Sequence, residues 1–154
     1  MEMHRTGRTV AFSGGISVLS WGSIGGKLEA QGPLAGYFDE LSTDSFFGCK
    51  TWEKGEAAMQ RRALERALQK GGLSPEDLDY ILAGDLLNQC IGTSFSLREF
   101  RVPFYGLYGA CSTMGEGLSL ASLLIDGGFA RLAAAQTSSH YCTAERQYRM
   151  PVPY

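Results

Sequence analysis

Three segments in the second half of the chain carry its clearest hydrophobic patterns. Residues 79–87 are almost all apolar, which predicts a strand buried on both faces of a parallel sheet. Residues 102–108 combine aromatic and β-branched side chains with an early proline and predict another strand. From residue 114 to residue 125 apolar positions follow helical spacing on two faces, which predicts a buried helix, covered nearly all round.

The remaining segments alternate between strand and helix patterns. They are a strand at residues 9–13, a glycine-rich loop region to residue 39, an amphipathic helix at residues 52–70, short helices that begin at Ser74 and span residues 92–101, and a strand at residues 131–138. The alternation predicts an α/β fold with a mostly parallel sheet and helices on both of its faces.

Composition and charge limit the classes of function. The chain has 154 residues, of which 44% are hydrophobic and 19% charged, enough for one domain with a sizeable core. Its 14 basic and 16 acidic residues are well mixed, so no basic stripe indicates a nucleic-acid partner or a membrane patch. No apolar run reaches the length of a membrane span, so any membrane association is expected to come through partners.

The four cysteines follow no metal-binding or redox spacing. They stand at positions 49, 90, 111 and 142 without a C-x-x-C pair, and no signal peptide is recognisable. This pattern favours a reduced intracellular protein over a disulfide or zinc scaffold, and no cofactor or metal site is predicted. Residues 22–27 resemble a phosphate loop only faintly, because the required spacing to Lys27 is absent and Leu28 follows it.

Cys111 is the principal candidate for chemistry. It stands where the strand at residues 102–108 turns into the next helix, and free backbone N–H groups at a helix start favour a thiolate and attract anions. The alternative is that Cys111 is only a small residue that fits a tight junction.

Two further polar residues each allow two interpretations. Asp85 ends a predicted parallel strand, where ligands commonly bind, but it can equally cap the following loop at Asn88 and Gln89. His140, in a polar tail that begins at residue 139, is expected to be a loop histidine with satisfied hydrogen bonds, with a functional role as the less favoured alternative.

Several motifs together resemble the stage V sporulation protein AD family of the thiolase-like superfamily. They are Gly-Asp-Leu-Leu-Asn-Gln at 84–89, Gly-Ala-Cys-Ser-Thr at 109–113, Asp-Gly-Gly-Phe-Ala at 126–130, Ser-Ser-His at 138–140 and Thr-Ala-Glu-Arg-Gln at 143–147. The resemblance implies a thiolase-like fold of two βαβαβ halves. Residues 1–154 would be a single N-terminal half-domain that stops before the last strand of that half.

The family resemblance also implies a function. Members bind dipicolinic acid or its calcium chelate without catalysis and support its uptake into the developing spore. The implied ligand-binding residues are Asp85, Cys111 and Ser112, with backbone N–H groups of Cys111 and Ser112 donating to a ligand carboxylate. The implied partners are other stage V sporulation membrane proteins and a second copy in a homodimer. The implied location is intracellular, in the forespore, peripheral to the inner spore membrane through these partners.

Two alternatives to ligand binding remain open. One is a condensing or thiolytic enzyme with Cys111 as the acyl-carrying nucleophile, for which the chain offers only His4 and His140 as candidate bases. The other is a docking subunit that binds no small ligand. In the thiolase fold, the strands at residues 102–108 and 131–138 are expected at the two edges of the sheet, so the chain alone is expected to associate or to be poorly soluble.

Overall fold

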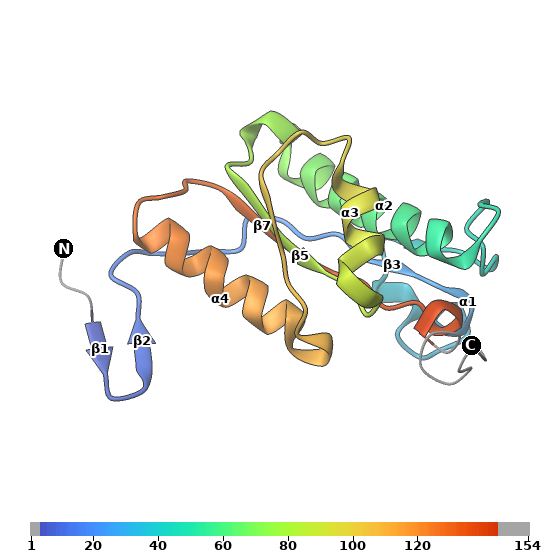
Figure 1. Ribbon diagram of the computed structural model, residues 1–154, viewed down its shortest axis with the longest axis horizontal. Coiled ribbons are helices and arrows are strands. Elements are labelled where there is room, and N and C mark those ends of the chain that lie inside the picture. Colours follow the sequence, from blue (N-terminus) through green and yellow to red (C-terminus); the bar gives the residue numbers. More distant parts are fainter. Residues whose placement is uncertain (1–3, 145–154) are drawn as a thin grey trace.

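The computed structural model describes residues 4–144, in which strands and helices alternate (Figure 1). The elements in chain order are β1 (His4–Thr6), β2 (Thr9–Ala11), β3 (Ile24–Gly25), α1 (Lys27–Ala30), β4 (Glu40–Leu41), α2 (Trp52–Gly71), β5 (Tyr80–Gly84), α3 (Ile91–Leu97), β6 (Phe104–Gly106), α4 (Thr113–Asp126) and β7 (Ala133–Thr137). Short 3₁₀ turns lie at Ala35–Tyr37, Pro75–Asp77, Asn88–Cys90 and Ala110–Ser112. The predicted α/β class is confirmed.

The main sheet has three parallel strands in the order β6-β5-β7. Ile81 in the central strand pairs with Phe104 on one side and with Ala134 on the other. The strands predicted from residues 102–108 and 131–138 therefore lie at the two edges, as expected. Among the described residues, both of these edges lack a further strand.

The central strand β5 is buried on both faces, as its sequence predicts. Ile81 and Ala83 pack with Leu64 and Leu68 of α2 in one core cluster, and Leu82 packs with Ala121 of α4 in a second. Figure 1 shows α2 and α4 on opposite sides of the sheet. The alternation of side chains along one strand thus divides the core into two layers.

Helix α2 begins and ends within one residue of its predicted bounds. The Thr51 hydroxyl accepts from the Lys54 N–H at 3.3 Å, which satisfies a donor of the first turn. At the other end Gly72 adopts a left-handed conformation, with φ 65°, and closes the helix. Both ends are therefore encoded locally.

Helix α4 is apolar on two faces, but the described chain covers only one of them. Gly117 and Ala121 are buried against the sheet. Other large hydrophobic residues of α4, which flank this buried stripe, and of residues 104–108 are exposed, namely Met114, Leu118, Leu120 and Leu123 of α4 with Phe104, Tyr105 and Tyr108. We call these seven residues the α4–β6 apolar face. The expectation of a helix covered nearly all round is therefore not met within residues 4–144.

The amino-terminal region differs from its predicted structure. The strand expected at residues 9–13 exists as β2, but it pairs antiparallel with β1 in a hairpin and is not part of the main sheet. The hairpin turns at Gly7, whose φ is 64°, and it projects from the rest of the chain in Figure 1. Ser13 and Gly14 then donate to the Asp126 carboxylate, which fixes the exit of the hairpin to the end of α4.

The region expected to be a loop, residues 14–39, contains secondary structure. Ile24 of β3 pairs in parallel with Glu40 of β4, which continues just beyond the region. Gly22 passes so close to α2 that a β-carbon would lie 2.2 Å from the Ala63 carbonyl oxygen. Glu40 accepts from Arg62 at 2.9 Å, and this contact holds the pKa of Glu40 below its ordinary value. These contacts pack the segment against α2.

Two short elements differ from the helices predicted for them. The helix expected at residues 92–101 is α3, which ends at Leu97, and the helix expected from Ser74 is a single 3₁₀ turn. The polar tail is described only to residue 144, so motif residues 145–147 lie outside the described residues. Within the described part of the chain, no helix is both long and apolar enough to cross a membrane.

We predict that the α4–β6 apolar face makes the 154-residue chain associate. Replacing Leu118, which is 48% exposed, by glutamate should weaken association at least tenfold, because burying one leucine contributes roughly 1.5–3 kcal/mol. Light scattering across a concentration series measures the effect. The matched substitution Ala121→Glu, on the buried face of the same helix, should instead unfold the chain. A monodisperse wild-type monomer at all concentrations would contradict the prediction.

Candidate functional site

A tight turn presents Cys111 between β6 and α4. Leu107 is buried just after β6, Ala110 adopts a left-handed φ of 48°, and Cys111 follows in the 3₁₀ turn that leads directly into α4. The Cys111 side chain is exposed. The predicted placement of this cysteine at a strand-to-helix turn is confirmed.

The turn is held by hydrogen bonds among its own residues. The Gly109 N–H donates to the hydroxyl of Thr113, which is 1% exposed, at 3.2 Å. Ser112 donates to the Gly109 carbonyl oxygen twice, from its N–H at 3.0 Å and from its hydroxyl at 2.7 Å. The Ser112 N–H, which we expected to donate to a ligand carboxylate, is therefore used within the turn, and so is the Ser112 hydroxyl.

The carboxyl end of β5 abuts this turn. A β-carbon on Gly84 would lie 2.0 Å from the Leu107 carbonyl oxygen and 2.8 Å from the Thr113 methyl group, so only glycine fits. Asp85 follows Gly84 directly, and β5 and β6 are parallel neighbours. The structure thus places Asp85 and the Cys111 turn together at the carboxyl-terminal ends of the strands, as predicted.

The Asp85 carboxylate is nevertheless directed into the chain. It is 1% exposed and accepts from the Leu87 N–H at 2.8 Å, the Thr93 N–H at 2.7 Å and the Thr93 hydroxyl at 2.5 Å. Thr93 is in the first turn of α3, where backbone N–H groups have no partner within the helix. Of the two interpretations of Asp85, the geometry favours the cap.

A second cysteine near the turn contrasts with Cys111. Cys90 adopts a left-handed φ of 52°, is buried, and donates from its thiol to the Leu107 carbonyl oxygen at 3.1 Å. Burial raises the pKa of the Cys90 thiol, and the nearby Asp85 charge adds to the effect. Cys90 therefore stabilises the base of the turn as a neutral thiol, whereas Cys111 faces solvent.

A buried polar stripe on α2 was missed at the sequence level. Glu56 and Gln60, each 2% exposed, continue the line of Leu64 and Leu68 at four-residue spacing toward the amino end of α2. Gln60 donates to the Gly84 carbonyl oxygen, so the polar half of the stripe crosses the carboxyl edge of the sheet. The i, i+4 continuation of an apolar stripe by polar residues was the available signal.

A hollow of about 240 Å³ lies beside this stripe. The last residue of β7 and the three residues after it form part of its wall. It is lined by Gly22, Ser23, Ile24, Glu56, Met59, Gln60, Ala63, Thr137, Ser138, Ser139 and His140. His140 Nε2 lies 2.8 Å from the Ser45 carbonyl oxygen, whereas its buried Nδ1 has no hydrogen-bond partner among residues 4–144. The expectation of a satisfied loop histidine thus holds for one ring nitrogen only, and His140 does not belong to the Cys111 turn.

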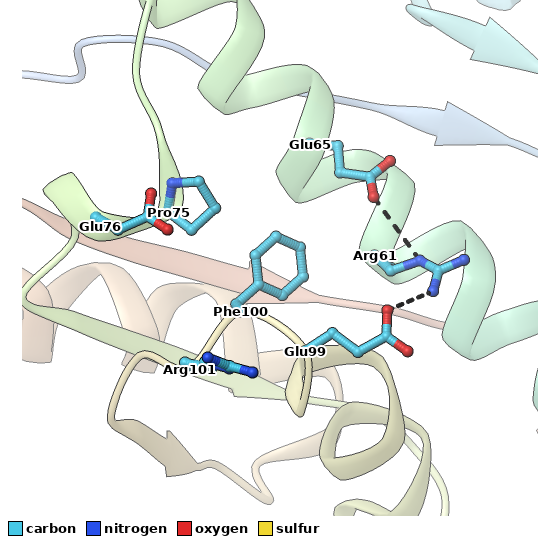
Figure 2. A pocket seen from close by; sticks show the side chains of 7 residues that line it. All are labelled: Arg61, Glu65, Pro75, Glu76, Glu99, Phe100 and Arg101. Carbon is cyan, nitrogen blue, oxygen red and sulfur yellow. Dashed lines mark hydrogen bonds and ion pairs between the residues drawn. The ribbon is translucent and has the colours of Figure 1, made fainter.

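Figure 2 shows a second hollow, of about 460 Å³, near the amino-terminal ends of the strands. It lies next to Pro75, which precedes β5, and Arg101, which precedes β6, so it faces the amino ends of the strands. Arg61 there is paired with Glu65 and with Glu99. Neither hollow is lined by Asp85, Cys111 or Ser112.

These features define an α/β protein with an exposed cysteine between a parallel strand and a helix. The family model for stage V sporulation protein AD matches residues 6–154. The chain is 44% identical over 153 residues to stage V sporulation protein AD of Bacillus subtilis (strain 168), covering 99% of this chain and 45% of that protein. The chain belongs to the stage V sporulation protein AD family and spans about half the length of this relative.

Two solved structures of 3-oxoacyl-(acyl carrier protein) synthase III are also similar to part of the chain. The structure from Aquifex aeolicus matches 58% of this chain and 31% of its own, at 24% identity and a TM-score of 0.49. The structure from Xanthomonas oryzae pv. oryzae matches 74% of this chain and 40% of its own, at 15% identity and a TM-score of 0.48.

We predict that Asp85→Ala lowers the free energy of unfolding by roughly 2–4 kcal/mol. The substitution leaves the buried N–H groups of Leu87 and Thr93 without their acceptor. Denaturant unfolding followed by circular dichroism measures the change. Glu99→Ala, which removes an exposed carboxylate next to the same helix, is the control and should change stability little. Equal effects of the two substitutions would refute the capping role.

We also predict that Cys111 reacts with iodoacetamide at least tenfold faster than Cys90 at neutral pH. Cys111 is exposed, whereas Cys90 is buried, donates to a carbonyl oxygen and has a raised pKa. Mass spectrometry of peptides after timed labelling of the folded chain gives both rates, and labelling in denaturant provides the reference. Similar folded-state rates would show that the turn is not arranged as described.

Proposed function

We propose that this chain takes part in binding dipicolinic acid, or its calcium chelate, and in its uptake into the developing spore. Membership of the stage V sporulation protein AD family is the observation that carries the proposal. The role is binding without catalysis. The chain spans 45% of the length of this relative.

The Cys111 turn is the proposed point of contact with the ligand. It is exposed at the amino end of α4, a helix of 14 residues whose dipole favours a carboxylate there. Ser112 supports this contact by fixing the Gly109 carbonyl group, and Asp85 supports it as a positioning residue that fixes the start of α3. Calcium would arrive with the ligand, since no three His, Cys, Asp or Glu side chains within residues 4–144 are grouped to hold a metal.

The proposal includes partners and a location. The protein acts in the forespore, peripheral to the inner spore membrane and held there by other stage V sporulation membrane proteins. A second copy pairs with the open β6 edge, where Tyr105 and Phe104 are exposed. The exposed α4–β6 apolar face supports a contact with further protein at this position.

The alternative function is acyl transfer with Cys111 as the nucleophile. Its exposure at a helix start favours this chemistry, but a cysteine nucleophile also needs a base within reach. His140 contacts Ser45 and lines the hollow beside Glu56, which gives it a different role in this chain. The binding function is therefore preferred.

Calorimetry on the complete protein tests the proposal. Cys111→Ala should weaken dipicolinate binding about tenfold or more without loss of stability, because it removes the side chain at the proposed contact. Cys49→Ala, in the loop before α2, is the control and should bind as the parent does. Parent-like binding by Cys111→Ala would place the ligand elsewhere. A stable mass addition at Cys111 from an acyl-CoA would instead favour the enzyme.

A further inference from the structure

The Glu56 side chain joins α2 to the segment that follows β7. Its Oε1 accepts from the Ser138 hydroxyl at 2.8 Å, and its Oε2 lies 2.5 Å from the Thr143 hydroxyl oxygen. Glu56 is 2% exposed and Thr143 is 1% exposed, so the contact between them is buried, whereas the contact with Ser138 is part-buried beside the hollow. Residues 138–143 are thus fastened to the helix through both oxygens of one carboxyl group.

A count of hydrogens indicates the form of this carboxyl group. The Thr143 hydroxyl oxygen also lies 2.8 Å from the His140 carbonyl oxygen. A hydroxyl group carries one hydrogen and a carbonyl oxygen carries none, so one hydrogen cannot fully serve both contacts. If the Thr143 hydrogen goes to His140, the contact with Glu56 needs a hydrogen on Glu56. The neutral acid therefore provides every contact with a hydrogen of its own.

We propose that Glu56 is a proton-dependent latch. As a neutral acid it donates to Thr143, accepts from Ser138 and holds residues 138–143 against α2. As a carboxylate it keeps the Thr143 hydrogen, which the His140 carbonyl group then loses, and it carries a buried charge, so the segment loosens and exposes the carboxylate to the hollow that the segment helps to line. The latch goes beyond the proposed function and does not depend on it.

The surroundings of Glu56 favour the neutral form. Burial raises the pKa of Glu56 above its ordinary value of 4.5, and the Asp85 charge at the end of β5 acts in the same direction. The hydroxyl contacts with Thr143 and Ser138 and the charge of His140 act in the opposite direction and do not cancel the effect of burial. Because the folded state holds the proton more tightly than the unfolded state, the stabilisation is complete below the unfolded pKa. It is lost as the pH rises through the raised folded pKa.

Hydrogen–deuterium exchange of the 154-residue chain tests the latch. After correction for intrinsic rates, amides in residues 138–144 should lose protection about fivefold or more between about pH 5 and about pH 8, the effect of one lost hydrogen bond. Peptides from the middle of α2 serve as the internal reference. Glu56→Gln keeps a neutral donor at the same place, so its protection in residues 138–144 should not change over this range.

Two further variants keep the test decisive. Glu65→Gln, an exposed glutamate of the same helix, should keep the pH dependence of the parent. Thr143→Val should show low protection in residues 138–144 at both pH values, because the hydroxyl group of the latch is absent. An unchanged parent profile between the two pH values, or a parent-like pH dependence in Glu56→Gln, would overturn the proposal.

Discussion

The arrangement of the sheet and its helices depends on the hydrogen bonds of Gln60. Its amide nitrogen donates to the Gly84 carbonyl oxygen and the Thr93 hydroxyl, its amide oxygen accepts from Ser96, and its backbone oxygen accepts from Gln136. One buried residue of α2 therefore meets β5, α3 and β7. Because each partner is buried, none of them can turn to water if the others move, and the four elements keep one relative position.

The hydrogen bonds of Gln60 continue to Asp85, at the carboxyl end of β5. Thr93 accepts from Gln60 and donates to Asp85, which in turn holds the Leu87 N–H. The leucines at the other end of α2 pack on the sheet through apolar contacts, whereas the hydrogen bonds of Gln60 fix the register of the helix on the sheet. Buried hydrogen bonds therefore fix the carboxyl-terminal ends of the strands, where the candidate site lies.

The sequence was informative where one element carries its own pattern. The two-sided burial of β5, the bounds of α2 and the position of Cys111 all follow from local periodicity and capping residues. The two-residue ladder of β3 and β4 was not predictable, since Ile24 and Glu40 are too short a pattern to show periodicity. The inward direction of Asp85 depends on Thr93, and no local signal distinguishes a capping carboxylate from one that binds a ligand.

The contact at Gly84 also restricts which substitutions this protein can tolerate. A single added carbon would overlap the Leu107 carbonyl oxygen, so every replacement must push β6 away from β5. The Leu107 N–H donates to the Ala83 carbonyl oxygen of β5, so a shift of Leu107 disturbs this hydrogen bond. The shift also moves the Cys111 turn, because Leu107 is only four residues before the cysteine. Any side chain at position 84 would therefore alter the position of the cysteine turn as well.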